Sequence, residues 1–191
     1  HLQNPALVKQ LRTSELHVGK AVETVLRSER FFADATVRAR VPGPVEWAVS
    51  AARRFGPLEP PPSPVKLGRW AARMGQSLYY PPNVGGWPGG RTWLSPLALL
   101  GRANLAADLV SGRTAAPAGA PLDVLGLARR HGRAGSREEV AGFVTDLILG
   151  GSPNAGWAES VRAAAGETPD DATFARRAAI AVLASPEAQL G

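Results

Sequence analysis

The sequence predicts an all-α protein, and three observations support this. Apolar residues recur at spacings of three, four and seven along most of the chain, which is the period of one helix face. Residues that cap or begin helices stand before most of these segments. No segment alternates apolar and polar residues over the length of a typical strand. With 191 residues, 45% of them apolar and 20% charged, the chain is long enough for one domain with a sizeable core.

Four helices are expected before residue 75. The first covers residues 5–12, and Ser14 is placed to cap the second. Pro44 suits the first turn of the third, which ends before Gly56. The proline-rich segment Glu59–Pro64 predicts an extended linker before the fourth. The expected apolar faces of the second, third and fourth helices are Val18, Ala21, Val22 and Val25, then Val45, Ala48, Val49, Ala52 and Phe55, then Leu67, Trp70, Ala71 and Met74.

Two helices are expected between residues 95 and 132. Ser95 and Pro96 read as a cap followed by a proline at the first helical position. A linker of small residues, 114–120, separates this helix from the next, which should cover residues 121–131. The apolar stripe expected on the first of the two consists of Leu97, Leu100, Ala103, Ala107 and Val110.

Three helices are expected in the last third of the chain. Ser136 and Glu139 form a capping box before a strongly amphipathic segment. A weaker helix should cover residues 154–165, and Thr168–Asp171 opens the last helix. The two apolar stripes are Val140, Phe143, Val144, Leu147 and Ile148, and Phe174, Ala178, Ala181 and Val182. About nine helices are therefore expected, in an irregular bundle.

We expect a single helical domain over residues 1–191, with a loop at residues 76–93 joining two helical halves. The chain begins with His1 rather than Met, which favours a piece of a longer protein. Any export signal would then lie upstream, since no basic and apolar leader is present. The longest apolar run, Ala178–Ala184, is far shorter than the roughly 20 residues that span a bilayer.

The residues that most often carry catalysis have ordinary structural explanations here. The chain has no cysteine, and His1, His17 and His131 lack the spacing of metal ligands. No nucleophile elbow, phosphate-binding loop or dinucleotide fingerprint is present. We therefore predict no metal site and no cofactor. The acidic residues that open expected helices complement the helix dipole; they are Glu46, Glu138, Glu139, Asp170 and Asp171.

The basic balance of the chain is weak support for a nucleic-acid partner. The formal net charge is +6, from 22 Lys and Arg against 16 Asp and Glu. Only Lys9, Lys20 and Lys66 are lysines, and this preference for arginine is typical of a GC-rich genome. The arginines are scattered and form no basic run. Binding through them would have to weaken steeply with salt.

The loop at residues 76–93 has the most unusual composition of the chain. It contains four aromatic residues between Tyr79 and Trp93, and seven of the ten residues from Pro81 to Gly90 are glycine or proline. Large side chains must anchor such a segment if it is to be ordered. In one interpretation Trp87 and Trp93 fill a groove between helices, and Asn83 bonds the backbone of its own turn.

In the other interpretation, the aromatic residues form a platform for a flat ligand or the face of a sugar ring. Asn83 and Arg91 then supply polar contacts, and glycine amides could bind an anion. Asn104 adds to this interpretation because it shares the stripe of Leu97, although a hydrogen bond between helices would satisfy a buried asparagine equally well. The candidate ligand-binding residues are Tyr79, Tyr80, Asn83, Trp87, Arg91, Trp93 and Asn104.

Several of these residues carry a resemblance to a known family. The central stretches are Met74-Gly75-Gln76, Tyr80-Pro81-Pro82-Asn83-Val84, Gly86-Trp87-Pro88-Gly89-Gly90, Trp93 and Arg102-Ala103-Asn104. Flanking stretches are Pro5-Ala6-Leu7-Val8, Leu26-Arg27-Ser28-Glu29-Arg30-Phe31-Phe32, Pro44-Val45-Glu46 and Ala184-Ser185-Pro186-Glu187-Ala188-Gln189-Leu190. Together they resemble the C-terminal part of the bacterial family called domain of unknown function 1800 (DUF1800).

The resemblance implies a mostly helical protein made with an export signal and placed outside the cytoplasm. It also implies a partner encoded nearby, an exported protein similar to the sulfatase and alkaline phosphatase superfamily. No activity comes with the resemblance. Our leading hypothesis is an exported binding or scaffold module that recognises a glycan or another extracellular polymer through residues 79–93.

Two alternatives from other classes remain open. The first is an exported enzyme of the hydrolase type, whose catalytic residues lie mostly in an N-terminal portion outside this sequence. Turnover by the longer protein but not by this chain would favour it. The second is nucleic-acid binding through the arginines.

Overall fold

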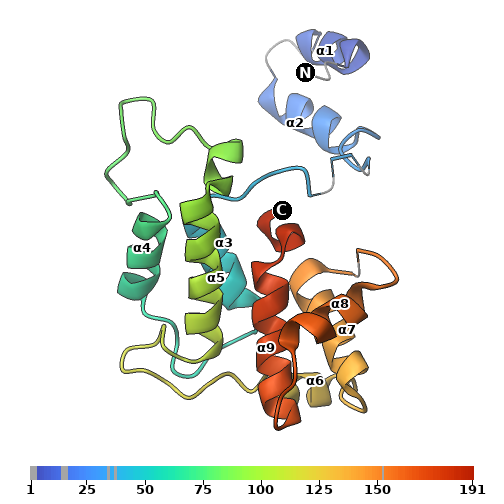
Figure 1. Cartoon of the computed structure of the whole chain (residues 1–191). Helices are drawn as coiled ribbons and strands as arrows, with labels where there is room; N and C mark the ends of the chain where they lie inside the picture. Colours follow the sequence, from blue (N-terminus) through green and yellow to red (C-terminus); the bar gives the residue numbers. More distant parts are fainter. Residues whose placement is uncertain (1–3, 14–16, 34, 37, 152) are drawn as a thin grey trace. The chain divides into compact units, whose positions relative to one another are not determined.

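The computed structural model describes residues 4–13, 17–33, 35–36, 38–151 and 153–191. Within these ranges the chain forms nine α-helices, two short 3-10 helices and no strand, so the all-α prediction is confirmed (Figure 1). The only pairing of strand type in the described ranges is an isolated bridge between Pro62 and Ala115. The elements are α1 (Pro5–Arg12), α2 (Val18–Leu26), α3 (Pro44–Arg54), α4 (Pro64–Arg73), η1 (Gly90–Leu94), α5 (Pro96–Val110), α6 (Val124–Arg130), α7 (Arg137–Leu149), α8 (Trp157–Ala165), α9 (Asp171–Ala184) and η2 (Pro186–Gln189).

The chain divides into two compact units, residues 1–39 and residues 40–191. The first contains α1 and α2, neither of which has a buried residue. The expected cap Ser14 lies outside the described residues, and α2 is capped by His17, whose Nδ1 accepts from the Lys20 amide at 3.5 Å. The 76–93 loop, expected to join two helical halves, lies entirely within the second unit.

The core of the second unit is built around α9. This helix packs against α5, α6, α7 and α8, and Figure 1 shows α9 between α5 on one side and α7 and α8 on the other. Three of its alanines, Ala175, Ala178 and Ala179, are completely buried. Small side chains allow neighbouring helix axes to approach closely. The rest of the buried α9 face is Phe174, Val182 and Leu183.

The buried face of α5 differs from the predicted stripe. Leu97 and Leu100 are 66% and 61% exposed, while Ala98, Leu105 and Leu109 are buried. The helix is apolar on both sides, so its periodicity fits two faces equally well. Packing against α4 and α9 selects the face with small residues. On α3 the prediction holds in part: Ala48 and Phe55 are buried as predicted, while Val49 is exposed and Trp47 and Ala51 are buried instead.

Most predicted caps hold, and three boundaries move. Ser136 accepts from the Glu139 amide at 3.1 Å as predicted, but the Glu139 carboxylate accepts from Gly135 N–H rather than from Ser136. The helix predicted from residue 121 begins at Val124, after the cap Asp123, because the Asp123 carboxylate accepts from the Gly126 amide at 2.8 Å. Residue 64, assigned to the extended linker, is the first residue of α4. The helix expected from residue 154 begins at residue 157.

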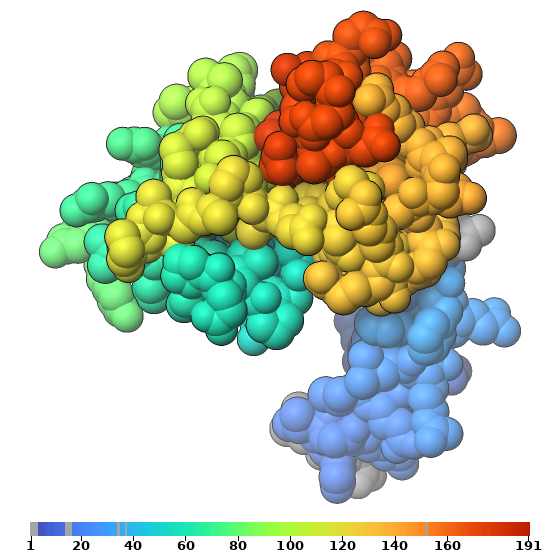
Figure 2. Space-filling model, turned by 90° about the horizontal axis from the view of Figure 1, so that it is seen from below, coloured from blue at the N-terminus to red at the C-terminus, as the bar shows by residue number. Residues whose placement is uncertain are grey.

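The two predicted linkers of the second unit lie alongside each other. Figure 2 shows the yellow segment that follows α5 running beside the teal segment that precedes α4. The Ser63 amide donates to the Thr114 carbonyl at 2.9 Å, and Lys66 Nζ donates to the Arg113 carbonyl at 2.8 Å. These bonds satisfy backbone groups that no helix pairs. No helix in the described ranges is long and apolar enough to cross a membrane.

The cap of α7 makes a measurable contribution to stability. Substituting Ser136→Ala removes the acceptor for the Glu139 amide and should lower the free energy of unfolding by about 1 kcal/mol. At this length that corresponds to a fall of roughly 2–4 °C in the midpoint of thermal unfolding. The matched control is Ser160→Ala, since Ser160 lies inside α8 and only donates to the Gly156 carbonyl. Alanine has the higher helix propensity, so the control should melt at or slightly above the parent. Equal melting of both variants would contradict the cap.

Candidate functional site

The 76–93 loop connects the end of α4 to the start of α5, and Figure 1 shows it projecting beyond both helix ends. Its roots are held tightly. The Gln76 side-chain oxygen accepts from the Val45 amide at 3.0 Å, which ties the loop to the first turn of α3. A Cβ atom on Gly101 would lie 2.5 Å from Cγ of Met74, so only glycine allows α5 to come this close to the end of α4.

Beneath the loop lies Arg102, a completely buried arginine on α5. Its Nη2 donates to the Pro42 carbonyl at 2.8 Å and to the Trp93 carbonyl at 3.4 Å. Its Nη1 donates to the Gln189 side-chain oxygen at 3.1 Å. The guanidinium also lies over the Trp47 ring, with Cζ 5.6 Å from the ring centroid. Arg102 therefore joins the segment before α3, the end of the loop and the C-terminal 3-10 helix.

The acceptors around Arg102 are neutral, and no carboxylate in the described ranges is paired with it. Burial without a counter-ion disfavours the charged guanidinium and lowers the pKa of Arg102 to about 10. The group remains protonated at neutral pH, so its donors must be satisfied by positioned oxygens. Its Nε has no hydrogen-bond partner in the described structure.

Gln189 and Trp47 extend this network. The Gln189 side-chain amide donates to the carbonyls of Leu183 and Ser185, at 3.1 Å and 2.8 Å, at the end of α9. The indole N–H of Trp47 donates to the Ala188 carbonyl at 3.0 Å. The Arg102 network, as we call these contacts, therefore fixes the end of α9 against α3 and α5.

The predicted site residues fall into two groups. Tyr79 and Tyr80 are 92% and 80% exposed, and Asn83 and Arg91 are exposed as well. Trp87 is half-buried. Asn83 Oδ1 accepts from the Gly85 amide at 2.8 Å, as the first interpretation expects. The loop thus presents the two tyrosines and Arg91 to solvent.

Trp93 and Asn104 lie in different environments from the residues at the tip of the loop. Trp93 is only 8% exposed, and its ring lies in the core beside Gly75, so it anchors the loop rather than facing a ligand. Asn104 shares the face of Leu97 and Leu100, as predicted, but this face of α5 is exposed. The expectation of a buried asparagine that needs partners is wrong, because packing selects the opposite face.

The backbone at Tyr79 is in an unusual conformation. Its φ angle is +66°, in the left-handed region that favours glycine. A residue with a side chain pays about 1 kcal/mol or more to adopt it, and such strain clusters at functional sites. The Tyr80 amide donates to the Ser77 carbonyl at 3.1 Å. This bond closes the tight turn on which the exposed rings of Tyr79 and Tyr80 stand.

Exposed apolar side chains occur within the loop and in the helix that follows it. Leu78 and Val84 are exposed within the loop, and Leu97 and Leu100 on α5 directly after it. An apolar cavity of about 290 Å³ lies between α3 and α4, and Leu78 forms part of its wall. Exposed apolar residues gathered in one segment are typical of an interaction surface.

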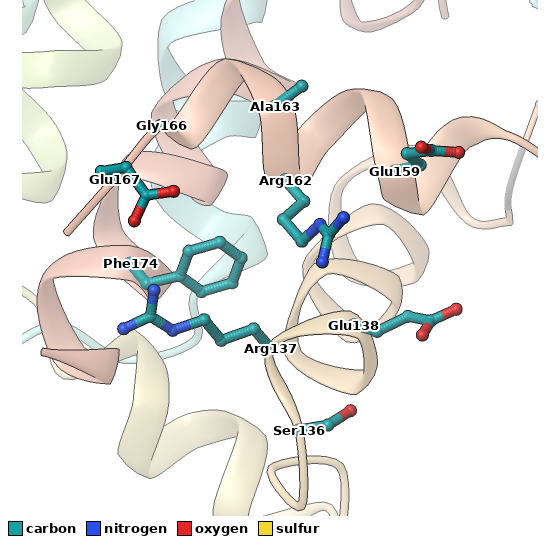
Figure 3. Close-up of a pocket in the computed structure, with 9 residues that line it drawn as sticks. All are labelled: Ser136, Arg137, Glu138, Glu159, Arg162, Ala163, Gly166, Glu167 and Phe174. Carbon is teal, nitrogen blue, oxygen red and sulfur yellow. The ribbon is translucent and has the colours of Figure 1, made fainter.

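A second candidate site is a surface pocket of about 640 Å³ between α7, α8 and α9. Figure 3 shows Arg137 extending beside the Phe174 ring, and Arg162 reaching from α8 toward α7. Arg137 Nε donates to Asp171 at 2.8 Å, and its Cζ lies 5.2 Å from the centroid of the Phe174 ring. The remaining lining residues are Ser136, Glu138, Glu159, Ala163, Gly166 and Glu167.

The charges of this pocket have structural explanations. Ser136 is the cap of α7, and Glu138 and Glu159 lie in the first turns of their helices, where the dipole favours acids. Glu138, Glu159 and Glu167, the three glutamates of the pocket, are exposed, so water screens their charges. In the described ranges no group of three His, Cys, Asp or Glu side chains could hold a metal ion. The 76–93 loop is therefore the stronger candidate.

Reasoning from periodicity missed the Arg102 network. Arg102 lies four residues after Ala98 and three before Leu105, on the buried face of α5. Had the stripe been phased on Ala98, Gly101, Leu105 and Leu109, an arginine in its middle would have been conspicuous. Gln76 and Gln189 belong to no apolar stripe, and the sequence feature that marks their segments is the resemblance to the family.

The fold and this network define an all-α protein in which a buried arginine joins three chain segments at the base of a projecting loop. The chain belongs to the family described as protein of unknown function (DUF1800), whose model matches residues 4–190. This confirms the resemblance. No curated protein and no solved structure matches the chain. The stretches that carried the resemblance contribute Gln76, Trp93, Arg102 and Gln189 to the loop roots and the Arg102 network.

The Arg102 network predicts an unusually costly arginine substitution. Arg102→Ala leaves buried carbonyl and amide oxygens without donors and opens a cavity, so we expect a loss of about 3 kcal/mol in the free energy of unfolding. That is roughly 6–12 °C in the melting midpoint. Arg102→Lys should recover only part of this, because one ammonium cannot reach acceptors spread around a planar guanidinium.

The control is Arg133→Ala, which removes an exposed ion pair with Asp146 at 3.3 Å. Such pairs contribute about 0–1 kcal/mol. Differential scanning calorimetry on the three variants separates the cases. If Arg102→Ala and Arg133→Ala melt within about 2 °C of each other, Arg102 does not hold the fold together.

Proposed function

We propose that this chain is an exported binding or scaffold module that recognises a glycan or another extracellular polymer through residues 79–93. One observation carries the proposal: two adjacent tyrosines are almost fully exposed on a loop whose ends are fixed in the core. Tyrosine rings supply a large contact area at low cost in conformational entropy, with an apolar face and a polar tip. Sugar rings present the same combination of an apolar face and a polar edge.

The fixed roots matter for affinity. A flexible loop must be ordered when a ligand binds, which weakens the complex. In this loop the bond from Val45 to Gln76, the buried Trp93 ring and the turn around Asn83 already restrict the backbone. A ligand would therefore meet side chains whose positions are largely preset.

Solvent-exposed tyrosines contribute little to folding, which separates binding from stability. Tyr79 and Tyr80 take part in no aromatic pair or side-chain hydrogen bond in the described structure. Neither is part of the hydrophobic core. The Tyr79 side chain is 92% exposed, so within the described residues little packing offsets the strained φ angle. A ligand that stacks on the Tyr79 ring would account for both its exposure and its strained backbone.

The proposal includes export because the family that the chain resembles is made with an export signal.

The proposal predicts that Tyr79→Ala/Tyr80→Ala weakens binding to polysaccharides without unfolding the protein. We expect at least about a tenfold loss of affinity for the polymers that the parent retains, since contact aromatics are frequent hot spots. The melting midpoint should change by less than about 2 °C, as for other surface substitutions. Pull-down on insoluble chitin, cellulose and peptidoglycan, and a glycan array for soluble sugars, measure the binding.

The matched control is Phe31→Ala/Phe32→Ala, which removes two adjacent exposed aromatic rings outside the loop. This variant should bind as the parent does. Equal losses in both double variants would indicate non-specific adhesion of exposed rings. Retention of full binding by the tyrosine variant would overturn the role of the loop.

A further inference from the structure

The acidic residues of the chain are distributed very unevenly. Residues 60–107 make up a quarter of the sequence and contain none of its 16 Asp and Glu residues. The same segment, which we call the carboxylate-free segment, contains α4, the 76–93 loop and most of α5. Its cations are Lys66, Arg69, Arg73, Arg91 and Arg102. The loop therefore lies in the part of the chain where positive charge is not balanced locally.

Two of these five cations donate hydrogen bonds within the fold. Arg102 is buried in its network, and Lys66 donates to the carbonyls of Arg113 and Ala115. Arg69, Arg73 and Arg91 are exposed, and none of the ion pairs in the described ranges includes them. Three guanidinium groups are thus open to an external anion.

Arg73 and Arg91 lie at the two roots of the loop. Arg73 is the last residue of α4, and its Cζ lies 4.9 Å from the centroid of the Trp70 ring. Arg91 is the second residue of η1. The two roots are close together: a Cβ atom built on Gly75 would lie 3.7 Å from the Trp93 ring. Each arginine is two residues from this contact, so the exposed tyrosines project from a base that carries two cations.

Two carboxylates near the segment have partners: Asp108, which follows it directly, and Glu46, which follows the Val45 that Gln76 binds. Glu59, directly before the segment, takes part in none of the ion pairs in the described ranges. Glu46, in the first turn of α3, is paired with both terminal nitrogens of Arg40, and this pairing lowers the pKa of Glu46. Asp108, in the last turn of α5, accepts from Arg113 Nε at 2.8 Å and from Trp70 Nε1 at 3.2 Å. Glu46 and Asp108 are therefore already neutralised by cations outside the loop.

We propose that the ligand of the 76–93 loop is an acidic polysaccharide, with sugar rings on Tyr79 and Tyr80 and carboxylate or sulfate groups paired with Arg73 and Arg91. This inference rests on the binding function proposed above and narrows its ligand class. Guanidinium groups suit both anions, because their fork of donors matches two oxygens at once.

The density of charge favours a polysaccharide over a nucleic acid. A DNA duplex carries one negative charge per about 1.7 Å, and its binding proteins usually line the backbone with many cations. Here three exposed arginines are dispersed among aromatic and apolar side chains over 23 residues, from Arg69 to Arg91. A chain with one charge per sugar ring matches this alternation of charge and ring.

The test compares two polymers with the same backbone, polygalacturonate and its fully methyl-esterified, uncharged form. Isothermal titration of the full 191-residue chain measures both, at about 0.05 M and about 0.5 M salt, where screening lengths differ severalfold. We expect polygalacturonate to bind about tenfold more tightly at low salt. The difference should largely vanish at high salt.

Variants assign the preference to residues. Arg73→Gln/Arg91→Gln should bind both polymers equally and weakly, while Tyr79→Ala/Tyr80→Ala should lose both. Arg129→Gln/Arg130→Gln changes the net charge by the same amount on exposed residues of α6 and should keep the preference. If this control loses it too, the effect is bulk charge, and the assignment to the loop is wrong.

The outcomes separate the two proposals. Equal affinity of the parent for both polymers overturns the acidic ligand and leaves the binding loop standing. Binding to neither polymer overturns the acidic ligand, while the pull-down and array above still decide the binding function. Tighter binding of a single-stranded oligonucleotide of similar length than of polygalacturonate would replace the polysaccharide with a nucleic acid.

Discussion

The second unit is organised by the need to satisfy one buried guanidinium. Arg102 has no exposed surface and, among the described residues, no carboxylate partner, so neutral oxygens must take the place of water around it. Removing a charge from water is costly unless those oxygens are well placed. They come from residues 42, 93 and 189, which are far apart in sequence. Arg102 therefore joins three chain segments, and the bond from Trp47 to the Ala188 carbonyl reinforces one of these connections.

These connections link the end of the core to the base of the loop. Gln189 accepts from Arg102 with its oxygen and donates with its nitrogen to the carbonyls of Leu183, in α9, and Ser185, directly after it. One side-chain amide therefore joins Arg102 to the end of α9. Small residues make the approach possible: Gly101 admits Met74, and the alanines of α9 admit α5. The compact helical packing and the fixed loop are thus consequences of the same geometry.

The helices could be predicted from sequence because their signals are local. Ser95, Ser136 and Asp170 each accept from the amide of the third residue of their helix, as a cap requires. The buried face of α5 could not be predicted, because Leu97 and Leu100 on one side compete with Leu105 and Leu109 on the other. Arg102 was missed for a related reason: arginine is almost never fully buried, and its acceptors lie up to 87 residues away.

The two interpretations of the loop turn out to describe different residues of it. Composition treats Trp93 and Tyr79 alike, as aromatic residues in a flexible segment, yet one is in the core and the other is in solvent. What separates them is the Arg102 network: Arg102 Nη2 donates to the Trp93 carbonyl, whereas among the described residues no hydrogen bond joins this network to Tyr79. An anchor at the root and a platform at the tip are complementary, because exposed rings can serve as a preorganised surface only where the backbone beneath them is held.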